Sequence, residues 1–397
     1  MGYDISNHAV DVAFIRERLV PFVMGRGTLD DLEDDIDRAT RLSLIAHRAN
    51  TWGLRTMQLD HAIHDAQRTA AVPRPAPPAP PPQPFRPTLW QRLTGARPPS
   101  PPPAPTTAWV RTSGIPGFDS DLSVWGRPFF IVAEDTDEAL RGFDAYMQAG
   151  DDDVDAIARR MLTRLDAMRG KLDPRCDPEI AAALDGFYPL EAHLPQLDPS
   201  DAAIPDRASV RSHIEGKLLL MRRFWLERKS DDPIEDDLLD EPVAPSDYIE
   251  SLPFDIINLA SQTLPGWMGR GHVWPTRLFD EIGVKVSHLF ETPEPLFRDL
   301  VREDKRLRGM FGTTIPCNYS LGGYVPPEKI EAFVALLEKH RSDLILAWSD
   351  SKDPAGIDDM LAADYTKILE PALLARRNGH GFLEAAEVYS GFMGAMN

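Results

Sequence analysis

Cysteine is scarce in this chain of 397 residues, which contains only Cys176 and Cys317. So few cysteines imply no disulfide framework and exclude a cysteine-rich zinc site. Long apolar runs are also missing, because stretches such as Phe129–Ala133 and Leu218–Met221 are far too short to span a bilayer. The first residues show no basic stretch followed by an apolar one. We therefore expect no secretory signal and a cytoplasmic protein.

Positive charge is in short supply. The chain has 43 Lys and Arg against 62 Asp and Glu, which gives a formal net charge of -19 and a pI near 4.9. Binding to nucleic acid or to an anionic membrane surface requires clustered basic residues, so the composition disfavours both. An acidic protein of this kind suits high solubility and a basic protein partner.

The strong catalytic and cofactor motifs are absent. The sequence has no Walker A motif, no G-x-S-x-G, no H-E-x-x-H, no cysteine pair and no EF-hand loop. The glycines of Gly266-x-x-Gly269-x-Gly271 have the wrong spacing for a dinucleotide-binding turn, and they follow a predicted helix instead of a strand. We therefore predict no cofactor, and no enzyme class is indicated.

The clearest local pattern lies between residues 308 and 348. Met310–Cys317 is typical of a buried strand, and the glycine pair in Leu321–Tyr324 predicts a turn. Two prolines at 326 and 327 are suited to the first turn of a helix. That helix carries one apolar stripe, formed by Ile330, Phe333, Val334 and Leu337.

Similar patterns along the chain predict a helix-rich α+β fold, with short strands packed against helices. A strand is expected at residues 3–6, a helix begins at Asp11 and ends or kinks at Pro21, and Thr28 with Asp31 resembles a capping box. We divide the chain into an N-terminal helical region (1–70), a linker (71–107), an α+β region (108–230), an acidic loop (231–245) and a C-terminal α+β region (246–397).

The linker is rich in proline, with fifteen prolines at positions 73–105. Proline fixes φ and removes a hydrogen-bond donor, so this segment is predicted to be disordered and extended. It is interrupted by one short island, Phe85–Arg97, in which apolar and basic residues have no local core to join. We expect this island to dock either on its own protein or on a partner, through Leu89, Trp90 and Leu93.

A dense run of acids precedes the C-terminal region. Like charges at this density repel one another and stay solvated, so the run predicts an exposed loop. Such a loop is either a docking surface for a basic partner or a solvated face without a partner. Its acids are Asp231, Asp232, Glu235, Asp236, Asp237, Asp240 and Glu241.

Histidine and cysteine supply the remaining candidates. His61 and His64 share one face of a predicted helix and form either a metal site or an exposed polar face. His272 and Arg270 lie in a glycine-rich loop, 266–274, which is either a binding or catalytic site or a loop anchored by its tryptophans. Cys317, in the predicted buried strand, is a small apolar filler or else a nucleophile.

Three stretches carry a resemblance to known proteins. The opening Met-Gly-Tyr-Asp-Ile-Ser, the stretch Val124-Trp-Gly-Arg-Pro-Phe-Phe-Ile131 and the stretch Gly322-Gly-Tyr-Val-Pro-Pro327 resemble uncharacterised bacterial cytosolic proteins. Some of those proteins are similar to immunity proteins, which neutralise toxins delivered by contact. The resemblance covers about a third of the chain and carries over no functional residue. It implies a bacterial, non-enzymatic protein that binds a partner.

These observations lead to one main hypothesis and two alternatives. The main hypothesis is a non-enzymatic protein-binding protein, an immunity-type inhibitor of a basic toxin or effector. The first alternative is an enzyme of unknown class with a site near residues 266–274. The second is a scaffold that tethers partners through its proline-rich arm.

Overall fold

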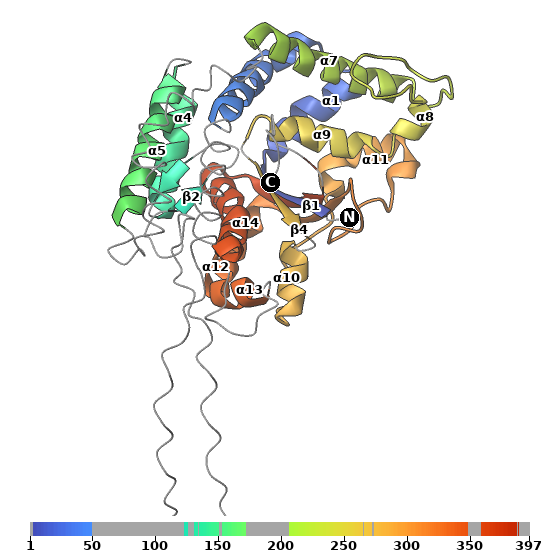
Figure 1. Ribbon diagram of the computed structural model, residues 1–397. Coiled ribbons are helices and arrows are strands. Elements are labelled where there is room, and N and C mark those ends of the chain that lie inside the picture. The colour runs from blue at the N-terminus through green and yellow to red at the C-terminus, as the bar shows by residue number, and fades with distance from the viewer. Residues whose placement is uncertain are drawn as a thin grey trace, which may run out of the picture.

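The computed structural model describes residues 3–49, 123–125, 131–133, 135–150, 153–171, 206–264, 266–271, 274–347, 359–386 and 388. These residues form a helix-rich α+β fold, as the sequence predicts (Figure 1). The predicted linker 71–107 and its island 85–97 lie outside the described residues. So does the predicted helix that carries His61 and His64.

A four-stranded antiparallel sheet forms the centre of the fold, in the order β4-β1-β6-β5. Its strands are β1 (Tyr3–Val10), β4 (Gly266–Gly271), β5 (Leu321–Val325) and β6 (Gly381–Ala386). Ile5 of β1 lies opposite Gly269 on one side and Ala386 on the other. The first strand of the chain is therefore an interior strand between two strands from its last third. Whether residues 1–70 pack on the remainder was left open by the sequence, and this pairing answers it for the described part.

One face of the sheet is covered by helices from the C-terminal region, α10 (Pro275–Glu281), α12 (Ile330–Lys339), α13 (Arg341–Ala347) and α14 (Asp359–Asn378) (Figure 1). Phe333 of α12 is central to this layer, since its ring lies 5.2 Å from that of Phe290 and 4.8 Å from that of Phe382. The predicted apolar stripe of α12 is buried in full. Gly379 follows α14 with a φ of 67°, the left-handed conformation in which glycine commonly ends a helix.

The other face is covered by segments from both ends of the chain. They are η1 (Phe14–Leu19, a π-helical stretch), α1 (Val20–Val23), η2 (Leu29–Leu32), the helix over 33–49, α9 (Leu252–Ser261), η5 (Glu294–Phe297), α11 (Arg298–Glu303) and η6 (Lys305–Leu307). Asp11 accepts a hydrogen bond from the backbone of Phe14, and Thr28 with Asp31 forms the predicted capping box. The helix does not end at Pro21, because η1 runs directly into α1 and the helical backbone continues to Val23.

A smaller two-stranded sheet packs into the same hydrophobic core as α10, α12, α13 and α14. Its strands are β2 (Ser123–Trp125) and β3 (Ile131–Ala133), and it packs with α4 (Thr136–Gln148) and α5 (Asp153–Lys171). Gly142 of α4 allows close contact, because a Cβ there would lie 2.6 Å from Cγ2 of Ile131. Asp135 caps α4, because its side chain accepts a hydrogen bond from the backbone nitrogen of Glu138.

Three sequence predictions about local structure are wrong. Residues 310–317 form no strand, and Cys317 is exposed instead of buried. Residues 321–324 belong to β5 and not to a turn, and neither Gly322 nor Gly323 has a positive φ. These glycines serve close packing, since a Cβ on Gly323 would lie 2.5 Å from Cδ1 of Phe290. Residues 266–271 form strand β4 and not a loop, because pairing with β1 outweighs the poor strand propensity of glycine.

Candidate partner-binding surface

The surface is built on α7 (Arg207–Leu226), the long helix at the top of Figure 1. Asp206 caps it by accepting a hydrogen bond from the backbone nitrogen of Ser209, at 2.9 Å. One stripe of α7 is buried in the core shared with the sheet, and its members are Val210, Ile214, Leu218, Met221 and Trp225. A second buried pair, Leu220 and Phe224, points toward the loop that follows the helix.

This loop, residues 231–241, has an apolar side that packs on the second pair. Ile234 is 2 % exposed and contacts the cluster of Leu220 and Phe224, against which Leu238 and Leu239 also pack. A Cβ on Gly216 would lie 2.9 Å from Cδ1 of Leu238, so the loop lies directly against the helix at that point. The loop therefore packs against α7 and does not project freely into solvent.

Backbone hydrogen bonds hold the two ends of the loop together. The backbone nitrogen of Ile234 donates to the carbonyl of Val243 at 2.9 Å, and the nitrogen of Val243 donates back at 3.2 Å. Helix α8 (Pro245–Tyr248) follows, and the ring of Tyr248 stacks on Phe224 with a centroid distance of 3.8 Å. These contacts fix where the acidic side chains of the loop project.

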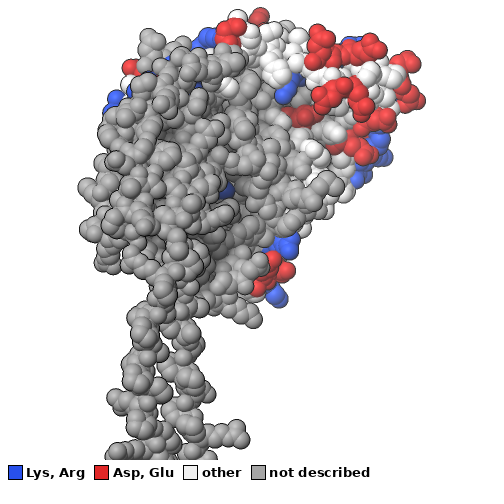
Figure 2. Space-filling model, viewed as in Figure 1, with Lys and Arg blue, Asp and Glu red and all other residues white. Residues whose placement is uncertain are grey.

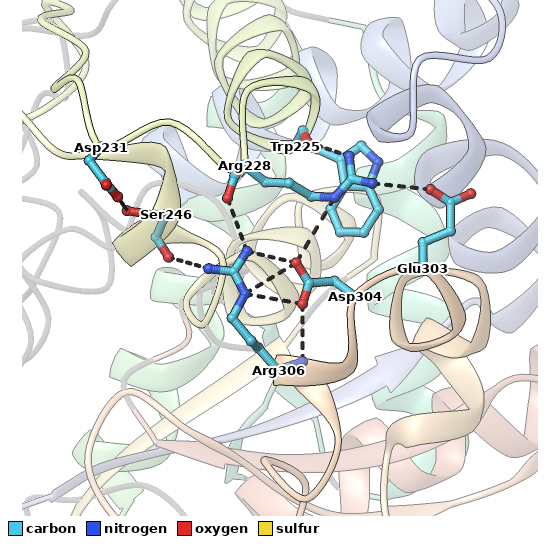
Figure 3. A network of polar contacts seen from close by, with 7 residues as sticks. All are labelled: Trp225, Arg228, Asp231, Ser246, Glu303, Asp304 and Arg306. Atoms are coloured by element: carbon cyan, nitrogen blue, oxygen red, sulfur yellow. Dashed lines mark hydrogen bonds and ion pairs between the residues drawn. The ribbon is translucent and has the colours of Figure 1, made fainter.

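A polar network fixes the base of the loop (Figure 3). The guanidinium of Arg306 donates to the carbonyls of Ser246 and Arg228, at 2.9 and 3.0 Å, and forms an ion pair with Asp304. The hydrogen bond from Arg306 is the main reason why the pKa of Asp304 lies below its usual range. Asp231, the first acid of the loop, accepts a hydrogen bond from the hydroxyl of Ser246 at 2.7 Å. One arginine thus ties the ends of α7 and α8 to η6.

A buried ionisable cluster lies beneath α8. The hydroxyl of Tyr248 donates a hydrogen bond to the carboxylate of Asp255 on α9, and Lys217 of α7 faces the same carboxylate. Burial raises the pKa of Asp255, an effect that Tyr248 and Lys217 oppose, and burial lowers the pKa of Lys217. The cluster connects α7, α8 and α9 below the acidic loop.

The seven acids of the loop are all exposed, as the sequence predicts. Residues 231–241 contain no lysine or arginine, and red carboxylates gather at the upper right of Figure 2, around the end of α7 and the loop. Leu219 and Leu226 of α7 are 49 % and 55 % exposed, and Arg222 and Arg223 lie between them along the helix. The loop itself presents a fixed set of negative charges, which suits a cationic protein surface.

The site contains features that the sequence analysis missed. The helical spacing of the buried stripe of α7 leaves Leu219 and Leu226 outside it, so the sequence pattern held a signal for both. No local signal marks Arg306 or Asp304, since their role depends on contacts with residues 228 and 246.

The alternative site near residues 266–274 is described by the structure only in part. Its backbone over 266–271 is strand β4, in which Arg270 lies opposite Asp4, while His272 lies outside the described residues. Leu89, Trp90, Leu93, His61 and His64 also lie outside them. Within the described part of the chain, no group of three or more His, Cys, Asp or Glu residues is arranged to hold a metal ion.

A buried carboxylate, which the sequence analysis also missed, lies next to Trp274. Glu384 of β6 is 0 % exposed and accepts hydrogen bonds from the backbone nitrogens of Thr276 and Gly323, both at 3.0 Å, and from the hydroxyl of Thr276 at 2.5 Å. The backbone of Ile315 donates a further bond. Burial raises the pKa of Glu384 to about 7, and these hydrogen bonds oppose the rise. The only sequence signal was a single acid in an apolar stretch.

The neighbours of Glu384 form a hydrogen-bonded chain that ends on its carboxylate. Because the indole nitrogen of Trp274 only donates, it bonds to the hydroxyl of Thr314, at 2.6 Å. That hydroxyl lies 2.7 Å from the hydroxyl of Thr276, which in turn bonds to Glu384. The group joins α10 and the segment around Thr314 to strands β5 and β6 of the sheet. A carboxylate with no exposed surface has an architectural role here and offers no contact to a substrate.

Comparison with known proteins gives no assignment: no family model, no curated protein and no solved structure matches the chain. Among the described residues, no helix combines the length and the apolar character needed to cross a membrane.

Proposed function

We propose that this protein is a non-enzymatic binding protein that recognises a basic protein partner through the acidic loop 231–241. The observation that carries the proposal is the fixed position of seven exposed carboxylates on a loop that packs its apolar side on α7. A loop held in place loses little conformational freedom when it binds, so more of the interaction energy contributes to affinity.

The electrostatics favour fast association. A cluster of carboxylates on a chain of net charge -19 attracts a cationic protein and raises the association rate. The exposed Leu219 and Leu226 supply apolar contact area on α7. Charge then guides the encounter, and apolar contact slows dissociation.

The resemblance described from the sequence gives the partner a biological class. We propose an immunity-type inhibitor that neutralises a basic toxin or effector in the bacterial cytoplasm. The enzyme alternative depends on His272, and a His272→Ala variant that keeps the full biological effect would remove that alternative.

The first experiment isolates the partner by purifying the protein from its native host, and then measures association of the purified pair by stopped flow. The loop variant carries Asp231→Asn, Asp232→Asn, Glu235→Gln, Asp236→Asn and Asp237→Asn. A control variant carries Asp137→Asn, Asp280→Asn, Glu328→Gln, Glu331→Gln and Glu338→Gln, which are exposed acids on α4, α10, η7 (Pro327–Lys329) and α12. Both variants change the net charge by the same amount.

We expect the loop variant to associate at least about tenfold more slowly than the control variant at low salt, because local charge governs steering. The difference should shrink as salt rises, since exposed charges are screened over about 8 Å at physiological ionic strength. Equal rates for the two variants would reject the loop as the binding surface.

A second variant separates the position of the charges from their number. Ile234→Ala leaves all seven acids in place but removes the buried side chain that holds the loop on α7. We expect weaker binding through faster dissociation, because the loosened loop must be ordered again on binding. A matched control is Leu239→Ala, which removes an only partly buried side chain of the same loop. If Ile234→Ala binds as tightly as the wild type, the fixed loop geometry is irrelevant to recognition.

A further inference from the structure

Glu384 is buried, but two hydroxyl groups connect its carboxylate to the surface of the protein. Oxygen Oε1 of Glu384 lies 2.5 Å from the hydroxyl of Thr276, and that hydroxyl lies 2.7 Å from the hydroxyl of Thr314. Glu384 is 0 % exposed and Thr276 is 8 % exposed, whereas Thr314 is an exposed residue. The two threonines therefore link an acid that has no contact with water to a residue that water reaches.

The indole of Trp274 fixes the outer end of this chain. A threonine hydroxyl has one O–H donor and two acceptor lone pairs. The indole nitrogen, which only donates, occupies one lone pair of Thr314 at 2.6 Å. Thr314 keeps its O–H and its second lone pair for two further contacts, one with Thr276 and one with solvent.

When Glu384 is ionised, both hydroxyls donate inward. The carboxylate accepts from Thr276, the oxygen of Thr276 accepts from Thr314, and the second lone pair of Thr314 faces solvent. The backbone nitrogens of Thr276, Gly323 and Ile315 complete the set of donors around the carboxylate. The buried charge is thus stabilised entirely by hydrogen bonds.

When Glu384 is protonated on Oε1, both hydroxyls turn around while the oxygen atoms keep their positions. The acid donates to Thr276, Thr276 donates to Thr314, and Thr314 donates to water. Oε1 retains a lone pair for the backbone nitrogen of Gly323, which lies at 3.0 Å. Every oxygen of the chain keeps its hydrogen-bond partners in both protonation states, as buried polar groups require.

We propose that Thr276 and Thr314 form a proton relay, through which Glu384 exchanges its proton with solvent while the fold stays closed. A proton from water binds the free lone pair of Thr314, the hydroxyl proton of Thr314 passes to Thr276, and the hydroxyl proton of Thr276 passes to Oε1 of Glu384. One proton enters and one reaches the carboxylate, so each threonine ends with one hydrogen on its oxygen. Release follows the reverse order.

The elements packed around Glu384 bring few other ionisable groups to it. The residue opposite it in β1 is Asn7, an uncharged amide. Glu370 of α14, in the helical layer over this face, is also buried and has interactions of its own. The ionisable residues of α10 and of the segment 308–320 are exposed, and they are Arg277, Asp280, Glu281, Arg308, Cys317 and Tyr319. Burial and hydrogen bonds are therefore the main influences on the pKa of Glu384.

The relay suits an acid that titrates at neutral pH. Burial raises the pKa of Glu384 to about 7, so both protonation states are populated near neutrality. Without a relay, a fully buried carboxyl group meets water only when the structure opens locally. With the relay, the protonation of Glu384 follows the pH of the solvent in the closed fold, and the exposed hydroxyl of Thr314 reverses its direction with it.

The first test measures the midpoint of Glu384 protonation by infrared spectroscopy of the full-length protein. The carbonyl stretch of the protonated acid is identified by its absence in Glu384→Gln. Thr276→Val removes a charge-assisted donor to the ionised carboxylate, so the midpoint should rise by about 1 pH unit. Thr314→Val keeps that donor but leaves the Thr276 hydroxyl without an acceptor when Glu384 is protonated, so the midpoint should fall by about 1 pH unit.

The second test measures the rate of protonation after a light-triggered pH jump, with the same infrared band as the signal. Thr314→Val interrupts the relay, so Glu384 must wait for a local opening of the structure. We expect its protonation to be slowed at least about tenfold. An unchanged rate in Thr314→Val would reject the relay, even if the midpoint shifts.

Two matched variants serve as controls. Thr314→Ser keeps the hydroxyl and should keep the wild-type midpoint and rate. Thr313→Val makes the same substitution as Thr314→Val at the neighbouring exposed residue, outside the chain of hydroxyls, and should also change neither value. If Thr276→Val does not fold, the comparison of Thr314→Val with Thr314→Ser decides by itself.

Two further outcomes would overturn the relay. They are midpoint shifts in the same direction for Thr276→Val and Thr314→Val, and a Thr314→Ser variant that behaves like Thr314→Val. Neither outcome bears on the proposed function, because the relay does not involve the acidic loop.

Discussion

The acidic loop and Glu384 place the same chemical group in opposite environments. The seven loop carboxylates are exposed and project from a segment that is held by its apolar side chains. Glu384 is fully buried, and its carboxylate accepts hydrogen bonds from backbone nitrogens and from the hydroxyl of Thr276. Water stabilises the first group of charges, whereas only the surrounding protein stabilises the second. Exposed acids are therefore available for recognition at little cost to the fold, while a buried acid contributes to the fold and is unavailable to partners.

The largest effect is expected when the buried acid is removed. Glu384→Ala leaves a cavity and two buried backbone donors, those of Thr276 and Gly323, without their acceptor. We expect a loss of about 3–5 kcal/mol in the free energy of unfolding, measured by chemical denaturation at neutral pH. Glu331→Ala on the exposed face of α12 is the control and should change stability by less than about 0.5 kcal/mol. A small loss for Glu384→Ala would show that the sheet does not need this hydrogen-bonded group.

A smaller effect is expected from the protonation of Glu384. Its pKa is raised from 4.5 to about 7, so the folded state binds more protons than the unfolded state between these values. Stability should therefore fall as the pH rises through this window, by on the order of 3 kcal/mol. Glu384→Gln should remove this fall, although it lowers stability at the acidic end of the window. An unchanged pH slope in Glu384→Gln would contradict the prediction.

His8 lies on the face of the sheet opposite to Glu384, and its titration should change stability with pH in the opposite direction. Burial lowers its pKa from 6.5 to about 4, so the unfolded state binds more protons in that range and stability rises with pH. The contributions of His8 and Glu384 oppose each other between about pH 4.5 and 6.5, and the wild type should show a shallow dependence there. His8→Leu should steepen the fall of stability with pH, and Glu384→Gln should leave a net rise. Denaturation curves across this range for both variants provide the measurement.

The smallest effect on stability is expected at the acidic loop. The five substitutions of the loop variant should change the free energy of unfolding by less than about 0.5 kcal/mol, because the charges are exposed. Their loss also reduces repulsion among neighbouring acids, so a slight gain is the expected sign. A loss of more than about 1 kcal/mol would show that the loop carboxylates support the fold, and the contrast with Glu384 would then be wrong.

The sequence by itself determined the features that depend on neighbouring residues. The stripe of Ile330, Phe333, Val334 and Leu337 predicted a buried helix face, and the capping box of Thr28 with Asp31 predicted a helix start. Dense like charges predicted that the loop 231–241 is exposed. In each case the interacting groups lie within a few residues of one another, so the pattern is visible along the chain.

Tertiary structure decided the features whose partners are distant in sequence. Gly266–Gly271 is a strand because β1, more than 250 residues earlier, pairs with it, and Gly323 lies in β5 because Phe290 and the carboxylate of Glu384 approach its backbone. Glu384 became the centre of a hydrogen-bonded group only when α10 and β5 came together around it. Strand pairing and the satisfaction of buried polar groups are non-local, and no window of sequence contains both partners.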